Sequence, residues 1–273
     1  MADASAATAS SSTPRWREAW SSVANPSTRV AYVDDAERDR LRDHLDACGL
    51  RDALAAVDGE VHIRGAVAAS GPPAATLADV AALDLAGALL GPTGDSPDLR
   101  RAIRALERDV AAVVRSFGQC ADQPVAAVAV SLLRRTLCSK LHVDHVPLRV
   151  MVTYLGAGTE ILSEPASLAI SLAARRGGDA LGDLAKSLVG GAALSAGAAR
   201  RAEECEVVLL KGERWPGNEG RAIVHRSPIV DECCGEWRLC LRVDAPEHVN
   251  PLESMGDGSG APSEDARGEK TRE

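Results

Sequence analysis

Three residues in the second half of the chain have the types and spacing of a metal site. His142 and Asp144 stand two positions apart in the apolar, β-branched stretch of residues 140–154, which predicts a strand. Residues two apart on a strand point to the same face, so an imidazole and a carboxylate can reach one ion. His225, in the segment VHRSP, is the best candidate for a third ligand. Two histidines and one carboxylate leave coordination positions open, as in non-haem Fe(II) oxygenases and in catalytic zinc sites.

Two neighbours of this group are alternative fourth ligands. Cys138 would supply a thiolate and favour zinc, although a buried cysteine more commonly acts as a small apolar residue. His145 has the opposite parity to Asp144 on the predicted strand, which favours an outward orientation.

The elements that must position these residues predict an α+β protein. Residues 14–135 are mainly helical in pattern, with helices over residues 36–48, 77–90 and 97–116. Asp34 or Asp35 caps the first of these, and Asp95 or Ser96 caps the third. Short strands are expected at residues 29–33 and 61–64, the second within a loop over residues 58–75, and residues 125–133 suit a helix or a strand.

Residues 136–245 have a β pattern, with strands predicted over residues 138–154, 159–162, 206–211, 222–225 and 237–243. The last strand alternates Arg238, Cys240 and Arg242 with apolar residues, so one face is polar and the other buried. Residues 163–203 are rich in Ala, Gly and Ser and predict a low-complexity insertion or lid. Residues 1–13 and the acidic tail of residues 246–273 predict disorder.

Composition narrows the class of protein. The chain of 273 residues is long enough for one large domain or two small ones. Its net charge of −8 argues against nucleic acid as a partner but allows a local basic pocket. Seven cysteines without a regular framework indicate an intracellular protein, cytoplasmic by default, although residues 1–20 are also compatible with an organelle leader. Membrane binding is not expected, since no apolar run reaches spanning length.

Four blocks of the second half resemble the uncharacterised DUF1826 family of bacteria and algae. They are HVDHVPLRVMVTYLGAGTE, LLKGERWPGNEG, VHRSP and WRLCLRVD. The order of His142, Asp144, His225 and a downstream arginine is also distantly similar to the 2-oxoglutarate/Fe(II)-dependent oxygenases.

This second resemblance implies a double-stranded β-helix, of the jelly-roll and cupin kind, in the C-terminal half. It implies that His142, Asp144 and His225 hold Fe(II) and that Arg238 binds the far carboxylate of 2-oxoglutarate. Arg242 is the second choice for that carboxylate, and Tyr154 or Thr153 would add a hydroxyl group. The sequence lacks the Gly-Asp that these oxygenases carry before a later strand and has the WPGNEG loop instead.

The expected function is hydroxylation of a C–H bond of a small molecule or of a protein side chain. The alternative is a non-catalytic zinc-binding or metal-homeostasis protein that uses the same three ligands. A third possibility is a barrel that serves as an interaction module without metal.

Overall fold

The computed structural model describes residues 14–91, 96–197 and 199–246. The predicted tail of residues 1–13 and all but the first residue of the predicted tail of residues 246–273 lie outside the described residues. The helices are α1 (Pro14–Ala24), α2 (Ala36–Ala47), α3 (Leu50–Ala55), α4 (Pro73–Ala81), α5 (Leu85–Leu90), α6 (Pro97–Ala121), α7 (Glu164–Ala185) and α8 (Gly191–Ser195). The strands are β1 (Val30–Val33), β2 (Val61–Ala68), β3 (Val125–Leu133), β4 (Leu148–Gly156), β5 (Glu160–Ile161), β6 (Arg200–Arg201), β7 (Val207–Lys211), β8 (His225–Arg226) and β9 (Arg238–Asp244).

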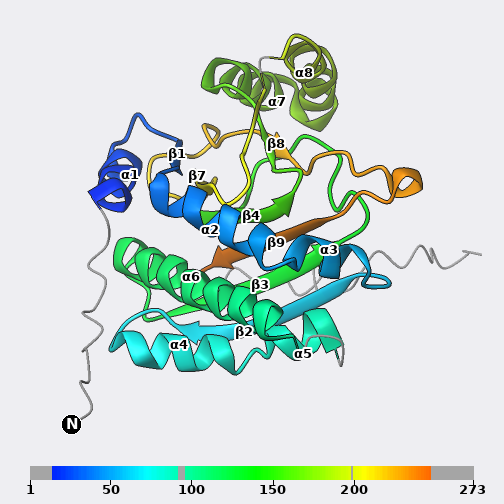
Figure 1. Ribbon diagram of the computed structural model, residues 1–273. Coiled ribbons are helices and arrows are strands. Elements are labelled where there is room, and N and C mark those ends of the chain that lie inside the picture. Colours follow the sequence, from blue (N-terminus) through cyan, green and yellow to red (C-terminus); the bar gives the residue numbers. More distant parts are fainter. Residues whose placement is uncertain (1–13, 92–95, 198, 247–273) are drawn as a thin grey trace, which may run out of the picture.

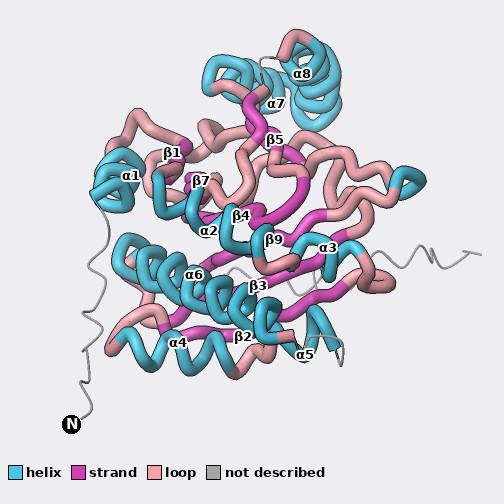
Figure 2. The backbone as a smooth tube through the Cα atoms, viewed as in Figure 1, coloured by secondary structure: helices cyan, strands magenta, loops and turns pink. Residues whose placement is uncertain are grey.

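The strands form two antiparallel sheets (Figures 1 and 2). The larger has six strands in the order β1-β7-β4-β9-β3-β2, and the smaller has three in the order β6-β5-β8. The predicted mixture of helices and antiparallel strands is therefore confirmed. The strands β1 and β3 come from residues 14–135 and pair with β7 and β9 of residues 136–245, so the large sheet draws on both predicted regions, and β2 extends it by pairing with β3.

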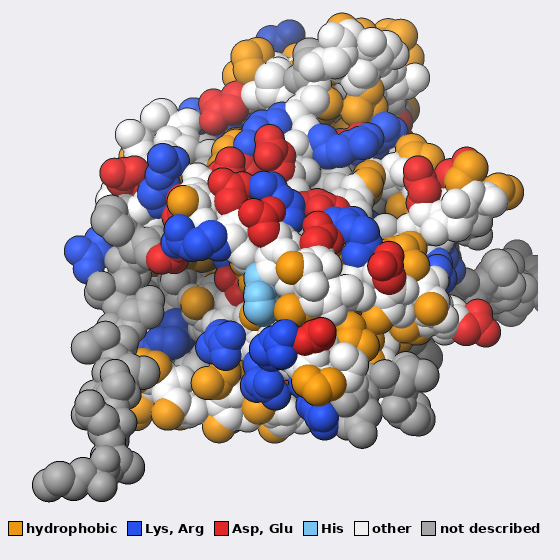
Figure 3. Space-filling model, viewed as in Figure 1, with side chains coloured by type: hydrophobic (Ala, Val, Ile, Leu, Met, Phe, Trp, Pro, Cys, Tyr) orange, Lys and Arg blue, Asp and Glu red, His pale blue; other side chains and the backbone are white. Residues whose placement is uncertain are grey.

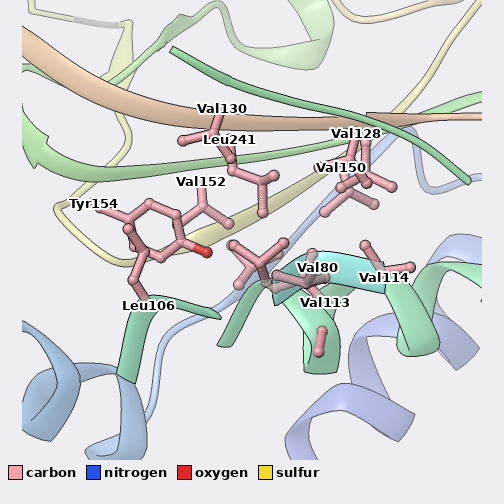
Figure 4. Packing of buried hydrophobic residues seen from close by; sticks show 14 of the residues in the cluster. Val80, Leu106, Val113, Val114, Val128, Val130, Val150, Val152, Tyr154 and Leu241 are labelled. Atoms are coloured by element: carbon pink, nitrogen blue, oxygen red, sulfur yellow. The ribbon is translucent and has the colours of Figure 1, made fainter. Parts of the chain in front are cut away.

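Helices α2, α4 and α6 cover one face of the large sheet (Figure 1). Helix α6 begins where predicted, because the Ser96 hydroxyl accepts a hydrogen bond from the Asp98 amide at its first turn. Its apolar side packs on valines of β3 and β4, and Figure 4 shows Val113 and Val114 facing Val128 and Val150. Each such buried side chain stabilises the fold by about 1.5–3 kcal/mol, which fixes the sheet on this helix.

The other face of the large sheet is covered unevenly. Strand β7 is buried throughout, with Val207 and Leu209 in the helix-side core and Val208 and Leu210 against the small sheet. On β9 and β2, polar side chains occupy this face of the large sheet, opposite the helices, as the alternation in residues 237–243 predicts for β9. The small sheet thus closes the β7 end of this face, and the β9–β3–β2 end lines a cavity.

The segment predicted as a low-complexity insertion contains a helical hairpin that lies beyond the small sheet (Figure 1). Helix α7 breaks at Gly177 and Gly178, whose φ angles of −134° and 65° are not helical. A π-helical turn, Lys186–Gly190, then leads into α8. The hairpin packs through Ile170 and Ala185 on a small apolar cluster. Its high glycine content makes the segment hard to recognise as helical from the sequence, because glycine has a low helix propensity.

Several boundaries differ from the prediction. Strand β2 continues to Ala68, four residues past its predicted end, because β3 pairs with it along its whole length. Residues 77–90 form two helices rather than one, since Asp84 adopts φ 50° between α4 and α5. The stretch Pro73–Leu90 has the length and apolar composition of a membrane span, but here it is divided at this residue and contributes Val80 and Leu85 to the core.

Candidate metal centre

His142, Asp144 and His225 meet in space. One ligand atom from each lies within 4.8 Å of the others. The Asp144 Oδ2 atom is 3.3 Å from His225 Nε2, and Asp144 Oδ1 is 3.9 Å from His142 Nε2. The two imidazole rings are 4.5 Å apart between centroids. This separation suits three ligands that surround a single cation.

Backbone pairing sets the distance between the two histidines. The His142 amide donates to the His225 carbonyl, and the His225 amide donates to the His142 carbonyl, both at 3.0 Å. Apolar neighbours anchor this bridge, since Leu141 and Val224 belong to the cluster under the α7–α8 hairpin. The prediction of a strand through His142 and Asp144 is wrong in one respect: β4 begins only at Leu148, and His142 makes a single isolated bridge. Both ligands nevertheless lie on one side of this segment, since their ligand atoms come within 4.8 Å of each other and of His225.

Both imidazoles are held in the form that a metal requires. The Nδ1 atom of His142 lies 2.9 Å from the Lys140 carbonyl, and that of His225 lies 3.3 Å from the Ile223 carbonyl. A carbonyl only accepts, so a proton on each Nδ1 satisfies these contacts and leaves a lone pair on each Nε2. Those lone pairs are the ones directed at Asp144. Burial, together with the neighbouring His225, lowers the pKa of His142 and keeps its imidazole neutral.

Asp144 is buried as a carboxylate. Burial alone would raise its pKa, but His225, Arg149 and His142 outweigh that effect and hold the pKa well below its usual range. The Arg149 guanidinium donates to Asp144 Oδ1 at 2.6 Å and also binds Asp244. Asp144 Oδ2 is buried and has no hydrogen-bond partner among the described residues. An unpartnered carboxylate oxygen that faces a lone-pair nitrogen at 3.3 Å favours a cation between them.

The two histidines open into a cavity of about 450 Å³ on the uncovered part of the large sheet. Thr153, Arg238 and Arg242 line it, so the structure brings these predicted residues to the same space. Arg238 is only 6% exposed, and its Nη1 donates to the Ala157 carbonyl at 3.3 Å. Its Nε is buried without a partner among the described residues. A buried guanidinium with an unpartnered N–H group can bind an anion that enters the cavity.

Tyr154 does not reach the cavity. It shares a face of β4 with Val150 and Val152 and is fully buried beside Leu106 of α6 (Figure 4). Its hydroxyl donates to Asp109 Oδ2 at 2.7 Å. The role predicted for Tyr154 in carboxylate binding is therefore corrected, because successive residues on a strand face opposite sides and only Thr153 faces the cavity.

Substitution Tyr154→Phe should consequently affect stability and not the site. Removing the hydroxyl leaves Asp109 one hydrogen bond short in the core, which is expected to lower the free energy of unfolding by about 1–2 kcal/mol. Urea denaturation measures this loss, and zinc titration of the folded variant should give the wild-type affinity. A weakened zinc site with unchanged stability would contradict this assignment.

The alternative fourth ligands stay outside the group. Cys138 Sγ lies 3.5 Å from Nδ1 of His142, which is the nitrogen opposite the one that faces Asp144. His145 is exposed. Arg149 and Thr159 are among the cavity residues that were not predicted from the sequence. Arg149 carried a signal, because an arginine inside an apolar strand needs a buried acidic partner.

Comparison with known proteins gives a family and a set of remote structural likenesses. A family model described as "Protein of unknown function (DUF1826)" matches residues 38–244, which extends the resemblance well into the first half of the chain. No curated protein matches the chain.

Solved structures similar to the chain include two dioxygenases and a hydroxylase. The rice dioxygenase for auxin oxidation is 16% identical, with 84% of this chain and 78% of that chain covered and a TM-score of 0.40. The Arabidopsis thaliana enzyme of the same name, in complex with 2-oxoglutarate, is 10% identical, with coverage of 84% and 86% and a TM-score of 0.37. A Pseudomonas putida prolyl-4-hydroxylase is 10% identical, with coverage of 85% and 99% and a TM-score of 0.37. Such remote likeness carries no chemistry, so the function must be argued from the residues of the site.

Proposed function

The chain belongs to the DUF1826 family, whose description assigns no chemistry, and from its site we propose that it is an Fe(II)- and 2-oxoglutarate-dependent oxygenase. One observation carries the proposal. Two imidazoles and a buried carboxylate converge at the wall of a cavity that also holds a buried arginine with an unpartnered Nε.

The donor set fits a metal that keeps open positions. Three protein ligands of the two-histidine, one-carboxylate type leave further coordination sites on Fe(II), and these are needed for a cosubstrate and dioxygen. Asp144 Oδ2 is the group that most needs the ion, because it is buried and unpartnered among the described residues. Arg149 orients this carboxylate through Oδ1, which leaves Oδ2 directed toward the histidines.

The cavity fits a dicarboxylate cosubstrate. An arginine guanidinium pairs a carboxylate through two parallel hydrogen bonds, and Arg238 can offer its buried Nε in this way. Thr153 lines the same cavity and offers a hydroxyl group. Arg242 remains a secondary candidate, since its Nε already lies 3.2 Å from Asp244. These residues would hold the far end of 2-oxoglutarate while its other end reaches the metal.

The strand order supports a double-stranded β-helix. From β4 onward the chain passes repeatedly between the two sheets, with β4, β7 and β9 in the large sheet and β5, β6 and β8 in the small one. Two facing antiparallel sheets that share their strands in this way form a jelly roll. The metal ligands then lie at the open end, where His142 pairs with β8.

When bound, the metal and its cosubstrate would supply the oxidation of a C–H bond by dioxygen. The chain would orient the metal ligands and exclude water from the site. The Lys140 and Ile223 carbonyls fix the imidazoles, and Arg149 fixes the carboxylate. The cavity would hold the substrate, a small molecule or a protein side chain, against this centre.

Anaerobic addition of Fe(II) and then 2-oxoglutarate tests the proposal. The expected result is the weak visible charge-transfer band of the Fe(II)–2-oxoglutarate complex. The band should vanish in His142→Ala. In Arg238→Ala the apparent affinity for 2-oxoglutarate, measured from the band, should fall at least about tenfold. Arg104→Ala, on the exposed side of α6, is the matched control. Tight zinc binding without any band would reject the oxygenase and favour the metal-handling protein.

A further inference from the structure

The cavity extends far beyond the metal ligands, across the open face of β4, β9, β3 and β2. The register places Arg64 of β2 opposite Ala129, and Ala129 opposite Arg242 of β9. In the next row, His62 stands opposite Ser131, and Ser131 opposite Cys240. All six of these residues line the cavity. Small side chains on β3 therefore form a floor between basic side chains on the two neighbouring strands.

The lining of this cavity is strongly basic. Six arginines take part, namely Arg64, Arg135, Arg149, Arg226, Arg238 and Arg242. Among the described residues that line the cavity, none is Asp or Glu. The carboxylates that contact these arginines approach from outside it: Asp144 and Asp244 bind Arg149, Asp244 also binds Nε of Arg242, Glu160 binds Arg226, and Glu60 binds Arg135.

This concentration of arginine contrasts with the rest of the chain. The net charge is −8, and the helical face in Figure 3 carries Asp and Glu interspersed with Lys and Arg. A cavity lined by positively charged side chains attracts anions even when the net charge of the protein is negative. The footprint is concave and local, which suits a small molecule better than an extended nucleic acid that needs a basic stripe.

We propose that the β2 side of the cavity, formed by His62, Arg64 and Arg242, binds the phosphate or carboxylate group of a small anionic substrate. Its identification as a substrate subsite rests on the proposed oxygenase function. Ala129 offers only a methyl group between the two guanidinium groups, so an anion can lie there and accept hydrogen bonds from both sides. His62 lies at the edge of the subsite, with Nδ1 3.2 Å from the Ser131 hydroxyl and Nε2 3.5 Å from Glu60.

This subsite is separate from the one assigned to 2-oxoglutarate. Arg238 and Arg242 lie on the same face of β9, four residues apart, which is about 13 Å along a strand. Arg238 pairs with Leu133 and Gly156, whereas Arg242 pairs with Ala129 and Met151. The cavity thus presents one anion site near each end of β9.

Calorimetric titration of the metal-free full chain with inorganic phosphate, and separately with succinate, tests the subsite. Arg64→Gln should weaken binding of the preferred anion at least about tenfold, because one charge-assisted contact is lost. Arg104→Gln, an exposed arginine on the opposite face of the sheet, should bind like the wild type. The preference between phosphate and succinate identifies which anionic group the substrate carries.

The same variants separate this inference from the proposed function. Arg238→Gln should lose affinity for 2-oxoglutarate in the presence of Fe(II) and keep its affinity for phosphate, and Arg64→Gln should do the reverse. Anion binding that depends on Arg238 alone, or that Arg64→Gln and Arg104→Gln weaken equally, would overturn the subsite. Loss of the Fe(II)–2-oxoglutarate band with intact Arg64-dependent binding would instead reject the oxygenase and keep the anion site.

Discussion

Substitution His225→Ala is expected to weaken zinc binding by more than about 100-fold, since loss of residues that only support metal ligands already costs 10- to 100-fold. The imidazole is the part that is lost. The hydrogen bonds between residues 142 and 225 use backbone atoms, so the bridge survives in the alanine variant. Zinc serves as the probe because it is redox-inert and accepts the same ligands.

Isothermal titration of the purified chain measures this effect, with His145→Ala as the matched control. His145 is an exposed histidine beside Asp144. Its loss should leave the zinc affinity within about twofold of wild type, whereas a free-energy change of 1.4 kcal/mol would alter the affinity tenfold. Circular dichroism establishes that both variants are folded. Equal loss of affinity in the two variants would place the metal elsewhere.

Substitution Arg149→Leu is expected to lower the free energy of unfolding by about 3–5 kcal/mol. The guanidinium lies between two buried carboxylates, with Nη1 2.6 Å from Asp144 and Nε 2.8 Å from Asp244. Burial already raises the pKa of Asp244, and Arg149 is the main opposing influence. Leucine would leave both acids without their shared counter-charge in the interior.

Urea denaturation at neutral pH measures this loss. Adding Asp244→Asn to Arg149→Leu should recover more than about 1 kcal/mol, because it removes one of the two stranded charges. Arg104→Leu, on the exposed side of α6, should change stability by less than about 0.5 kcal/mol. A small loss in Arg149→Leu, similar to that of Arg104→Leu, would show that the buried pair contributes little.

The residues that meet at the candidate metal centre could be predicted because their spacing is local or tied to a motif. His142 and Asp144 are two apart, and extended backbone of any kind places them on one side. The alternation of Arg238 and Arg242 with leucines likewise indicates a strand with one polar face. The sequence does not show which residue each polar group pairs with in the folded protein.

Tyr154 and Arg149 illustrate that limit. Tyr154 binds Asp109, which lies 45 residues earlier on α6, and Arg149 binds Asp244, 95 residues later on β9. Neither pairing follows from periodicity, since both depend on how helices and strands pack. The register of β4 on β9 also shifts between Thr153 and Leu155, and such irregularities leave no reliable trace in a single sequence. The α7–α8 hairpin was missed for the opposite reason, because its composition resembles a flexible segment.

The backbone bridge between His142 and His225 determines when a metal site can exist during synthesis. The loop that it closes contains β4, β5, β6, the α7–α8 hairpin and β7, so the two imidazoles can meet only after the residues of all these elements have been synthesised. A nascent chain that ends before residue 225 carries a two-ligand fragment with no fixed geometry. A metal held by this group would therefore be selected on the finished scaffold, where ligand spacing discriminates between metals that an unfolded chain would bind in order of affinity alone.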